Sequence, residues 1–152
     1  IIVTGSEDEL IEYVDEFRKN WKSLPPDEIA LPTSVNGIRK YHIEGNQYKS
    51  GCPMHVRAAI NYNHWIQRKE IDMYYSDIKD GSKAKYIFLI KNNKTKENVI
   101  AFPNKLPKEL DLHSKIDYNT QIERSFLSPL KIMLEPTKWS YERKANLMDL
   151  FS

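Results

Sequence analysis

Two pairs of side chains have the spacing that metal or catalytic sites use. Cys52 and His55 form a C-x-x-H pair, which is half of a zinc site. A structural zinc ion takes four protein ligands, and the chain contains no second cysteine. As a nucleophile, Cys52 would need a positioned base that the sequence does not indicate. The better interpretation of Cys52 is a small apolar side chain.

Asp77 and Asp80 form the second pair, and two such carboxylates could hold Mg²⁺ for phosphoryl transfer. Carboxylates of that kind usually adjoin a buried strand, and the surrounding IDMYYSDIKDGS has no strand-like apolar run. A charged surface loop explains the pair more simply. The phosphate-binding glycine motifs and G-x-S-x-G are missing from the sequence. We therefore predict no catalytic and no metal-binding residue.

Cations beside aromatic side chains in the middle of the chain are the stronger signal. Residues 31–105 carry thirteen Lys and Arg against six Asp and Glu, whereas residues 1–30 are net acidic and residues 106–152 are neutral. Lysine and arginine bind phosphates irrespective of base sequence, and a solvated lysine-rich surface is the alternative. The candidate nucleic-acid-binding cations of this basic region include Arg39, Lys40, Lys49, Arg57, Lys83 and Lys85.

The 152 residues are enough for one domain, or for a domain with an appendage. With 40% hydrophobic residues and no apolar run near 18 residues, the sequence predicts a folded protein that does not enter a membrane. The single cysteine excludes an intrachain disulfide and favours a reducing compartment. Because the chain begins at Ile1, we expect a fragment, a processed product or a trimmed chain.

Periodicity predicts three helices and three short strands. A first helix follows the S-x-x-E capping box at Ser6 and ends before Pro25, with an aromatic stripe on one face. The other expected helices are 54–69 and 118–134, the latter capped by Asp117 and either kinked or broken at Pro129. Residues 31–53 are expected to be irregular apart from one short strand over 38–43. Two further strands are expected over 85–91 and 98–102, and these form a hairpin. The predicted fold class is α+β, with helices and a small antiparallel β-hairpin subdomain.

Several stretches together resemble the C-terminal thumb of family B replicative DNA polymerases of large tailed bacteriophages. The stretches, in the family's order, are TGSEDELIEYVDEF, ALPTSVNGIRKY, CPMHVRAAINYN, NVIAFP, IDYNTQIERSFLSPL and YERKANLMDLF. The resemblance covers nearly the whole chain. It implies a nucleotidyltransferase of viral DNA replication, whose thumb grips primer–template duplex DNA through phosphates and the minor groove.

The resemblance assigns roles to particular residues. Lys49, His55 and Arg57 lie on or next to the basic residues that flank the family's C-P-x-H-x-R motif, and Arg124 matches a basic position that faces the duplex. Ser128 stands where a relative has lysine, and Lys131, one helical turn later, is expected to replace it. The family's clamp-binding tail is matched by Leu147, Met148, Leu150 and Phe151.

The resemblance also implies a domain organisation and a set of partners. Residues 1–30 would be a helical stem continuing from a palm domain, 31–142 the thumb, and 143–152 the clamp-binding tail. The expected partners are duplex primer–template DNA, a sliding clamp and the polymerase's palm, fingers and exonuclease domains, in the cytoplasm of an infected bacterial host. The metal-binding acids belong to those other domains, so we expect no cofactor on this segment, Mg²⁺ at the active site of the intact polymerase, and no primer extension by this chain alone.

Two other interpretations of the sequence stay open. One is a free-standing nucleic-acid-binding module of the RNA-binding α+β kind, in which strand aromatics such as Tyr86 and Phe88 would stack on bases. Core packing is the simpler explanation of that pair. The other is a protein–protein adaptor that docks through the first helix and the C-terminal tail.

Overall fold

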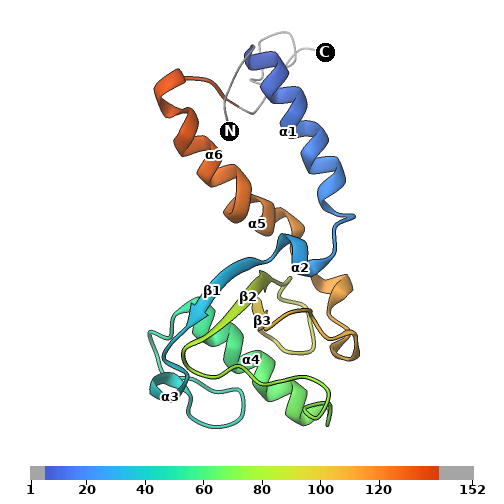
Figure 1. Cartoon of the computed structure of the whole chain (residues 1–152), viewed down its shortest axis with the longest axis vertical. Coiled ribbons are helices and arrows are strands. Elements are labelled where there is room, and N and C mark those ends of the chain that lie inside the picture. The colour runs from blue at the N-terminus through green and yellow to red at the C-terminus, as the bar shows by residue number, and fades with distance from the viewer. Residues whose placement is uncertain (1–5, 141–152) are drawn as a thin grey trace. The chain divides into compact units, whose positions relative to one another are not determined.

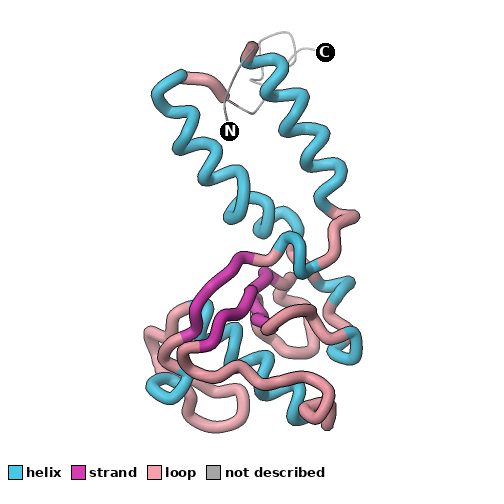
Figure 2. Tube along the Cα trace, viewed as in Figure 1, coloured by secondary structure: helices cyan, strands magenta, loops and turns pink. Residues whose placement is uncertain are grey.

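The computed structural model describes residues 6–140, which form two compact units. One unit comprises residues 24–121, and the other joins the described residues up to 23 with those from 122 onward. Figure 1 labels the helices and strands, and Figure 2 shows helices, strands and loops in the same view. The predicted division into 1–30, 31–142 and 143–152 stays a prediction.

The unit of residues 24–121 is a three-stranded antiparallel sheet in the order β1-β2-β3. Its helix α4 packs chiefly against β3, whose residues are all buried (Figure 1). The elements of this unit are α2 (Pro26–Ile29), β1 (Leu31–Val35), α3 (Ile38–Tyr41), α4 (Met54–Arg68), β2 (Ser82–Phe88), β3 (Val99–Phe102) and the 3₁₀ turns η1 (Lys108–Leu110) and η2 (His113–Lys115). The predicted α+β class and the antiparallel hairpin, now β2 and β3, are confirmed.

Two of the predicted strand assignments were wrong. Residues 31–35 form the strand β1 instead of an irregular segment. Pro32 does not prevent this, because β1 is an edge strand and one side of its backbone has no partner strand. Residues 38–41 form the short helix α3 instead of a strand. Gly37 precedes α3 with φ +116°, a left-handed conformation that turns the chain into the helix and favours glycine.

The second unit contains α1 (Glu7–Trp21), the π-helical segment η3 (Glu123–Leu127), α6 (Ser128–Leu134) and the 3₁₀ turn η4 (Glu135–Thr137). The predicted cap of α1 is confirmed, since the Ser6 hydroxyl accepts a hydrogen bond from the Glu9 N–H at 3.2 Å. On α1, Leu10, Val14 and Trp21 are buried, and the Phe17 ring stacks on Phe126 with centroids 4.2 Å apart. The apolar stripe of the first helix therefore has a partner within the chain.

Pro129 distorts the third predicted helix without ending it. This region begins with α5 (Tyr118–Ile122), which Asp117 caps as predicted by accepting a hydrogen bond from the Thr120 N–H at 3.1 Å. Pro129 has no N–H and its ring crowds the carbonyl four residues earlier. One turn before it the helix widens, and the Ser128 N–H bonds to the Glu123 carbonyl, five residues back. The π segment η3 lets the helical path continue through Pro129 into α6.

Candidate nucleic-acid interface

Three of the predicted cations gather on the loop between β1 and α4. Arg39 and Lys40 are exposed on α3, where the Lys40 Nζ lies 5.2 Å from the centroid of the Tyr41 ring. The backbone N–H of Lys49 donates to the Tyr41 carbonyl at 2.8 Å, which brings the exposed Lys49 next to α3. We call Arg39, Lys40 and Lys49 the α3 cluster. It brings three exposed cations from two parts of one loop near one another in the backbone.

Asp80 holds the α3 cluster in place. Its carboxylate accepts hydrogen bonds from the backbone N–H groups of Gly37 at 2.9 Å, Ile38 at 2.6 Å and Arg39 at 3.1 Å. Partial burial opposes ionisation, but these three donors and the Arg39 charge outweigh it and lower the pKa of Asp80. Asp80 is thus a cap supplied by a distant loop, and the loop that was predicted to be merely charged surface has a structural role.

We expect Asp80→Ala to lower the free energy of unfolding by about 1 kcal/mol, the usual value of a helix cap. Because the pKa of Asp80 is lowered in the folded state, its contribution is present above the ordinary carboxyl pKa and is lost as the pH falls through the folded value. Urea denaturation at neutral and at acidic pH measures both effects. Asp72→Ala, at an exposed carboxylate in the same region, is the control. Equal stability of the two variants at neutral pH would contradict the capping role.

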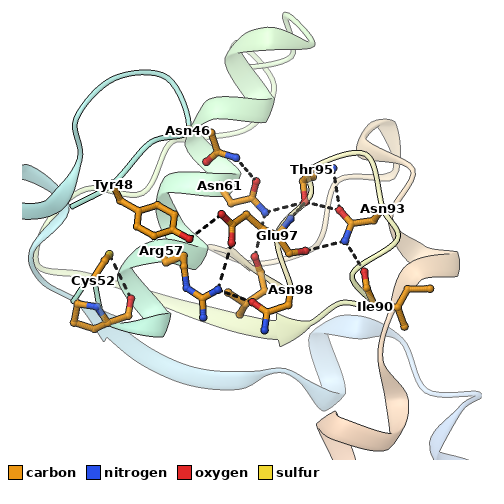
Figure 3. Close-up of polar contacts among 12 residues, drawn as sticks. Asn46, Tyr48, Cys52, Arg57, Asn61, Ile90, Asn93, Thr95, Glu97 and Asn98 are labelled. Carbon is orange, nitrogen blue, oxygen red and sulfur yellow. Dashed lines mark hydrogen bonds and ion pairs between the residues drawn. The ribbon is translucent and has the colours of Figure 1, made fainter. Parts of the chain in front are cut away.

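Arg57 forms an ion pair within the protein rather than standing free on the surface (Figure 3). Its Nη1 lies 3.3 Å from Glu97 Oε2 and donates to Asn98 Oδ1 at 2.5 Å. Tyr48 donates its hydroxyl to the other Glu97 oxygen at 2.9 Å. The Arg57 and Glu97 side chains are 19% and 17% exposed, so each charge is partly withdrawn from water. Glu97 therefore joins the β2–β3 connection to α4 through Arg57 and to the 42–52 loop through Tyr48.

Burial and this ion pair set the protonation of the neighbouring groups. The pKa of Tyr48 is raised by burial and by its hydrogen bond to Glu97. Burial also raises the pKa of the Cys52 thiol, against the opposing charge of Arg57. A thiol with a raised pKa is a poor nucleophile at neutral pH. Among residues 6–140, no three His, Cys, Asp or Glu side chains are grouped closely enough to hold a metal ion.

Buried amides continue the network toward the β2–β3 connection (Figure 3). Asn61 on α4 accepts from Asn46 at 2.9 Å and donates to the Val99 carbonyl at 3.1 Å and to the Thr95 hydroxyl at 3.3 Å. Asn93 in turn accepts from the Thr95 N–H at 2.9 Å. The predicted hairpin loop is therefore anchored by buried side chains, although its sequence is typical of a free turn.

The remaining predicted cations lie in several places. Lys83 is exposed on β2 opposite Ser34, whereas the half-buried Lys85 donates from Nζ to the Asp27 carbonyl at 3.0 Å. His55 is half-buried in the first turn of α4. Arg124 on η3 and Lys131 on α6 are exposed in the other unit. The predicted clamp-binding residues Leu147, Met148, Leu150 and Phe151 lie outside the described residues.

Of the two strand aromatics, Phe88 is packed in the interior and Tyr86 is half-buried beside it. Phe88 is 4% exposed, and Tyr86 contacts it edge-on with ring centroids 6.0 Å apart. Base stacking on Phe88 is therefore excluded, and the core packing expected for this residue is confirmed. Over the described range, no helix is both long and apolar enough to cross a membrane.

Comparison with known proteins accounts for the sequence stretches noted above. No family model matches the chain. It is 34% identical over 155 aligned residues to the DNA-directed DNA polymerase of Enterobacteria phage T4, and 33% identical over 128 to that of Escherichia phage RB69. The chain is related to a segment of the phage DNA-directed DNA polymerases. The matches cover 99% and 81% of the chain but only 17% and 14% of the polymerases, so the chain spans a small part of those relatives' length. The predicted resemblance to phage polymerases is confirmed.

Sequence reasoning missed the residues that position the polymerase segment's basic loop. Glu97 pairs with Arg57 from 40 positions away, and Asp80 caps a helix more than 40 positions earlier, so no local spacing signals either contact. The one local signal for the helix α3 was Gly37 directly before IRKY, because glycine is accepted at the N-cap position of a helix.

Proposed function

We propose that this chain is the thumb of a family B DNA polymerase and grips primer–template duplex DNA without sequence preference. The observation that carries the proposal is the 34% identity to the T4 polymerase across 99% of the chain. The α3 cluster supports it physically, because three exposed cations on one loop can neutralise several phosphates. We propose that the catalytic acids belong to the other polymerase domains, and we therefore expect no primer extension from this chain alone.

Palm, fingers and exonuclease domains, together with the Mg²⁺ of the active site, would complete the polymerase. The matched relatives are polymerases of bacteriophages. We therefore place the intact enzyme in the cytoplasm of an infected bacterium, in viral DNA replication. Residues 143–152 are proposed to tether it to a sliding clamp, on the strength of the sequence RKANLMDLFS.

A direct comparison of ligands distinguishes this function from its rivals. We expect the chain to bind a blunt 16-base-pair DNA duplex with a Kd of roughly 10–100 μM at physiological salt, in the range of non-specific binders. Binding to a single-stranded RNA of the same charge should be several-fold weaker. Fluorescence anisotropy with labelled ligands measures both. Preference for the RNA would favour an RNA-binding module, and binding to neither would favour an adaptor.

A further inference from the structure

An open cleft in the unit of residues 24–121 is not part of the α3 cluster. It has a volume of about 560 Å³, within the range of small-ligand sites. The loop after α4, the strand β2 and the segment after β3 form its walls. Its lining residues are Asp27, Tyr62, Tyr74, Tyr75, Ser76, Lys85, Pro103, Asn104 and Lys105. Three tyrosines and two lysines around one hollow are an unusual concentration of these residue types.

Two of the tyrosines form rigid walls. Tyr62 is 1% exposed and donates its hydroxyl to the Ser76 carbonyl at 2.9 Å, and burial raises its pKa to about 12. Tyr75 donates to Glu109 Oε2 at 2.6 Å. Both hydroxyls are therefore neutral and held in place by contacts within the protein, and these contacts anchor the loop that carries Tyr74.

Tyr74 differs from the other two tyrosines of the cleft because its side chain is largely exposed. It is 77% exposed at the cleft, and the adjacent Met73 is 80% exposed. Large apolar side chains exposed beside a hollow mark interaction sites more often than scattered surface residues do. The Tyr74 ring is thus available for stacking on a flat ligand, while the loop beneath it is fixed.

The charge of the cleft favours an anionic ligand. Lys85 and Lys105 line it, and Asp27 is the single carboxylate among the lining residues. Lys85 is fixed through its bond to the Asp27 carbonyl, and Lys105 is exposed. Asn104, also in the lining, offers one amide acceptor and two donors to a polar edge. The stacking surface, the cations and the amide together match a nucleotide better than they match an apolar ligand or an acidic peptide.

We propose that this cleft binds one unpaired nucleotide of single-stranded DNA, with its base stacked on Tyr74 and its phosphate beside Lys105 and Lys85. The inference deepens the proposed DNA-binding function by assigning a second, single-strand site to the same unit. Aromatic stacking combined with a few cations is the usual means of binding single strands without sequence preference. The site would hold an unpaired strand in the same unit that carries the α3 cluster.

The test uses the full chain and a fluorescein-labelled dT decamer, read by anisotropy. Tyr74→Ala should weaken binding by about tenfold, the usual effect of removing one stacked base contact. Tyr74→Phe, which keeps the ring, should stay within about twofold. Lys105→Ala should reduce the slope of log K against log salt by about 0.7, the value for one phosphate of a single strand.

Two controls isolate the stacking contact. Tyr13→Ala removes a tyrosine that is 55% exposed on α1, and it should leave decamer binding unchanged. An abasic decamer carries the same phosphates without bases, so it should bind equally well to the Tyr74→Ala variant and to the unchanged chain. Circular dichroism checks that each variant is folded, which is expected because Tyr74, Tyr13 and Lys105 are all exposed.

Several results would overturn the inference. One is that Tyr74→Ala and Tyr13→Ala weaken decamer binding equally. Another is that Tyr74→Ala weakens binding of the abasic decamer as much as binding of the dT decamer. The third is that an oligoglutamate peptide competes with the labelled decamer as strongly as unlabelled dT does. If blunt duplex binds and the decamer does not, the cleft proposal is wrong while the proposed function stands. If the decamer binds through Tyr74 and duplex does not bind, the cleft proposal stands and the duplex grip is wrong.

Discussion

Gln121→Ala is expected to lower the free energy of unfolding of the 24–121 unit by about 3 kcal/mol. The Gln121 side chain is fully buried and bridges two separate segments: its Oε1 accepts from the Phe88 N–H at 2.9 Å and its Nε2 donates to the Ile29 carbonyl at 2.7 Å. Truncation would leave a buried donor and a buried acceptor without this partner, and each such loss costs about 1–3 kcal/mol. Urea denaturation followed by circular dichroism measures the change.

Gln67→Ala is the matched control, because Gln67 is an exposed glutamine on α4. It should change the free energy of unfolding by less than about 0.5 kcal/mol, as surface substitutions usually do. A Gln121→Ala variant as stable as the Gln67→Ala variant would mean that the bridge contributes nothing to the fold.

If residues 143–152 tether the chain to a sliding clamp as proposed, Phe151→Ala is expected to weaken clamp binding by about 2 kcal/mol, or roughly 30-fold. Docking peptides of this kind concentrate their binding energy in one or two apolar anchors, and Phe151 is the only aromatic residue of the RKANLMDLFS sequence. Titrating the clamp into a fluorescent peptide of residues 143–152, and into the full chain, measures the loss. Ser152→Ala, at the neighbouring small polar residue, should have no effect.

The same variant also tests the alternative that the tail belongs to the fold. Under the tether proposal, Phe151→Ala leaves duplex binding and the melting temperature of the chain nearly unchanged. A peptide that does not bind the clamp, or a melting temperature that falls by several degrees in the variant, would show that Phe151 packs on the protein itself.

The elements with strong local signals were predicted correctly. The helix of residues 54–68 has apolar side chains at helical spacing, and the β2–β3 hairpin has two apolar runs separated by turn formers. The cap at Ser6 and the effect of Pro129 depend on neighbours within five positions. Such features are determined by residues close in sequence, so a single sequence is enough to find them.

The errors arose where distant residues decide the structure. The IRKY segment alternates weakly like a strand, but the Asp80 carboxylate caps it as a helix. The ion pair of Arg57 with Glu97, 40 positions away, was likewise not foreseen, and a DNA contact of Arg57 stays a prediction. Tyr74 and Lys105 lie thirty-one positions apart on two irregular segments, and only the fold brings them to one cleft. These contacts depend on tertiary structure, which periodicity and propensity do not encode.

The salt dependence of duplex binding tests the proposed DNA grip most directly. If four to six phosphates are engaged, log K should fall against log salt with a slope of roughly −4 to −5, equally for duplexes of unrelated sequence. Lys40→Ala with Lys49→Ala should reduce the magnitude of that slope by about 2, and Lys19→Ala with Lys22→Ala, at exposed lysines of α1, should leave it unchanged. An affinity insensitive to salt, or a preference above about tenfold for one sequence, would contradict the proposal, since phosphate contacts carry no sequence information.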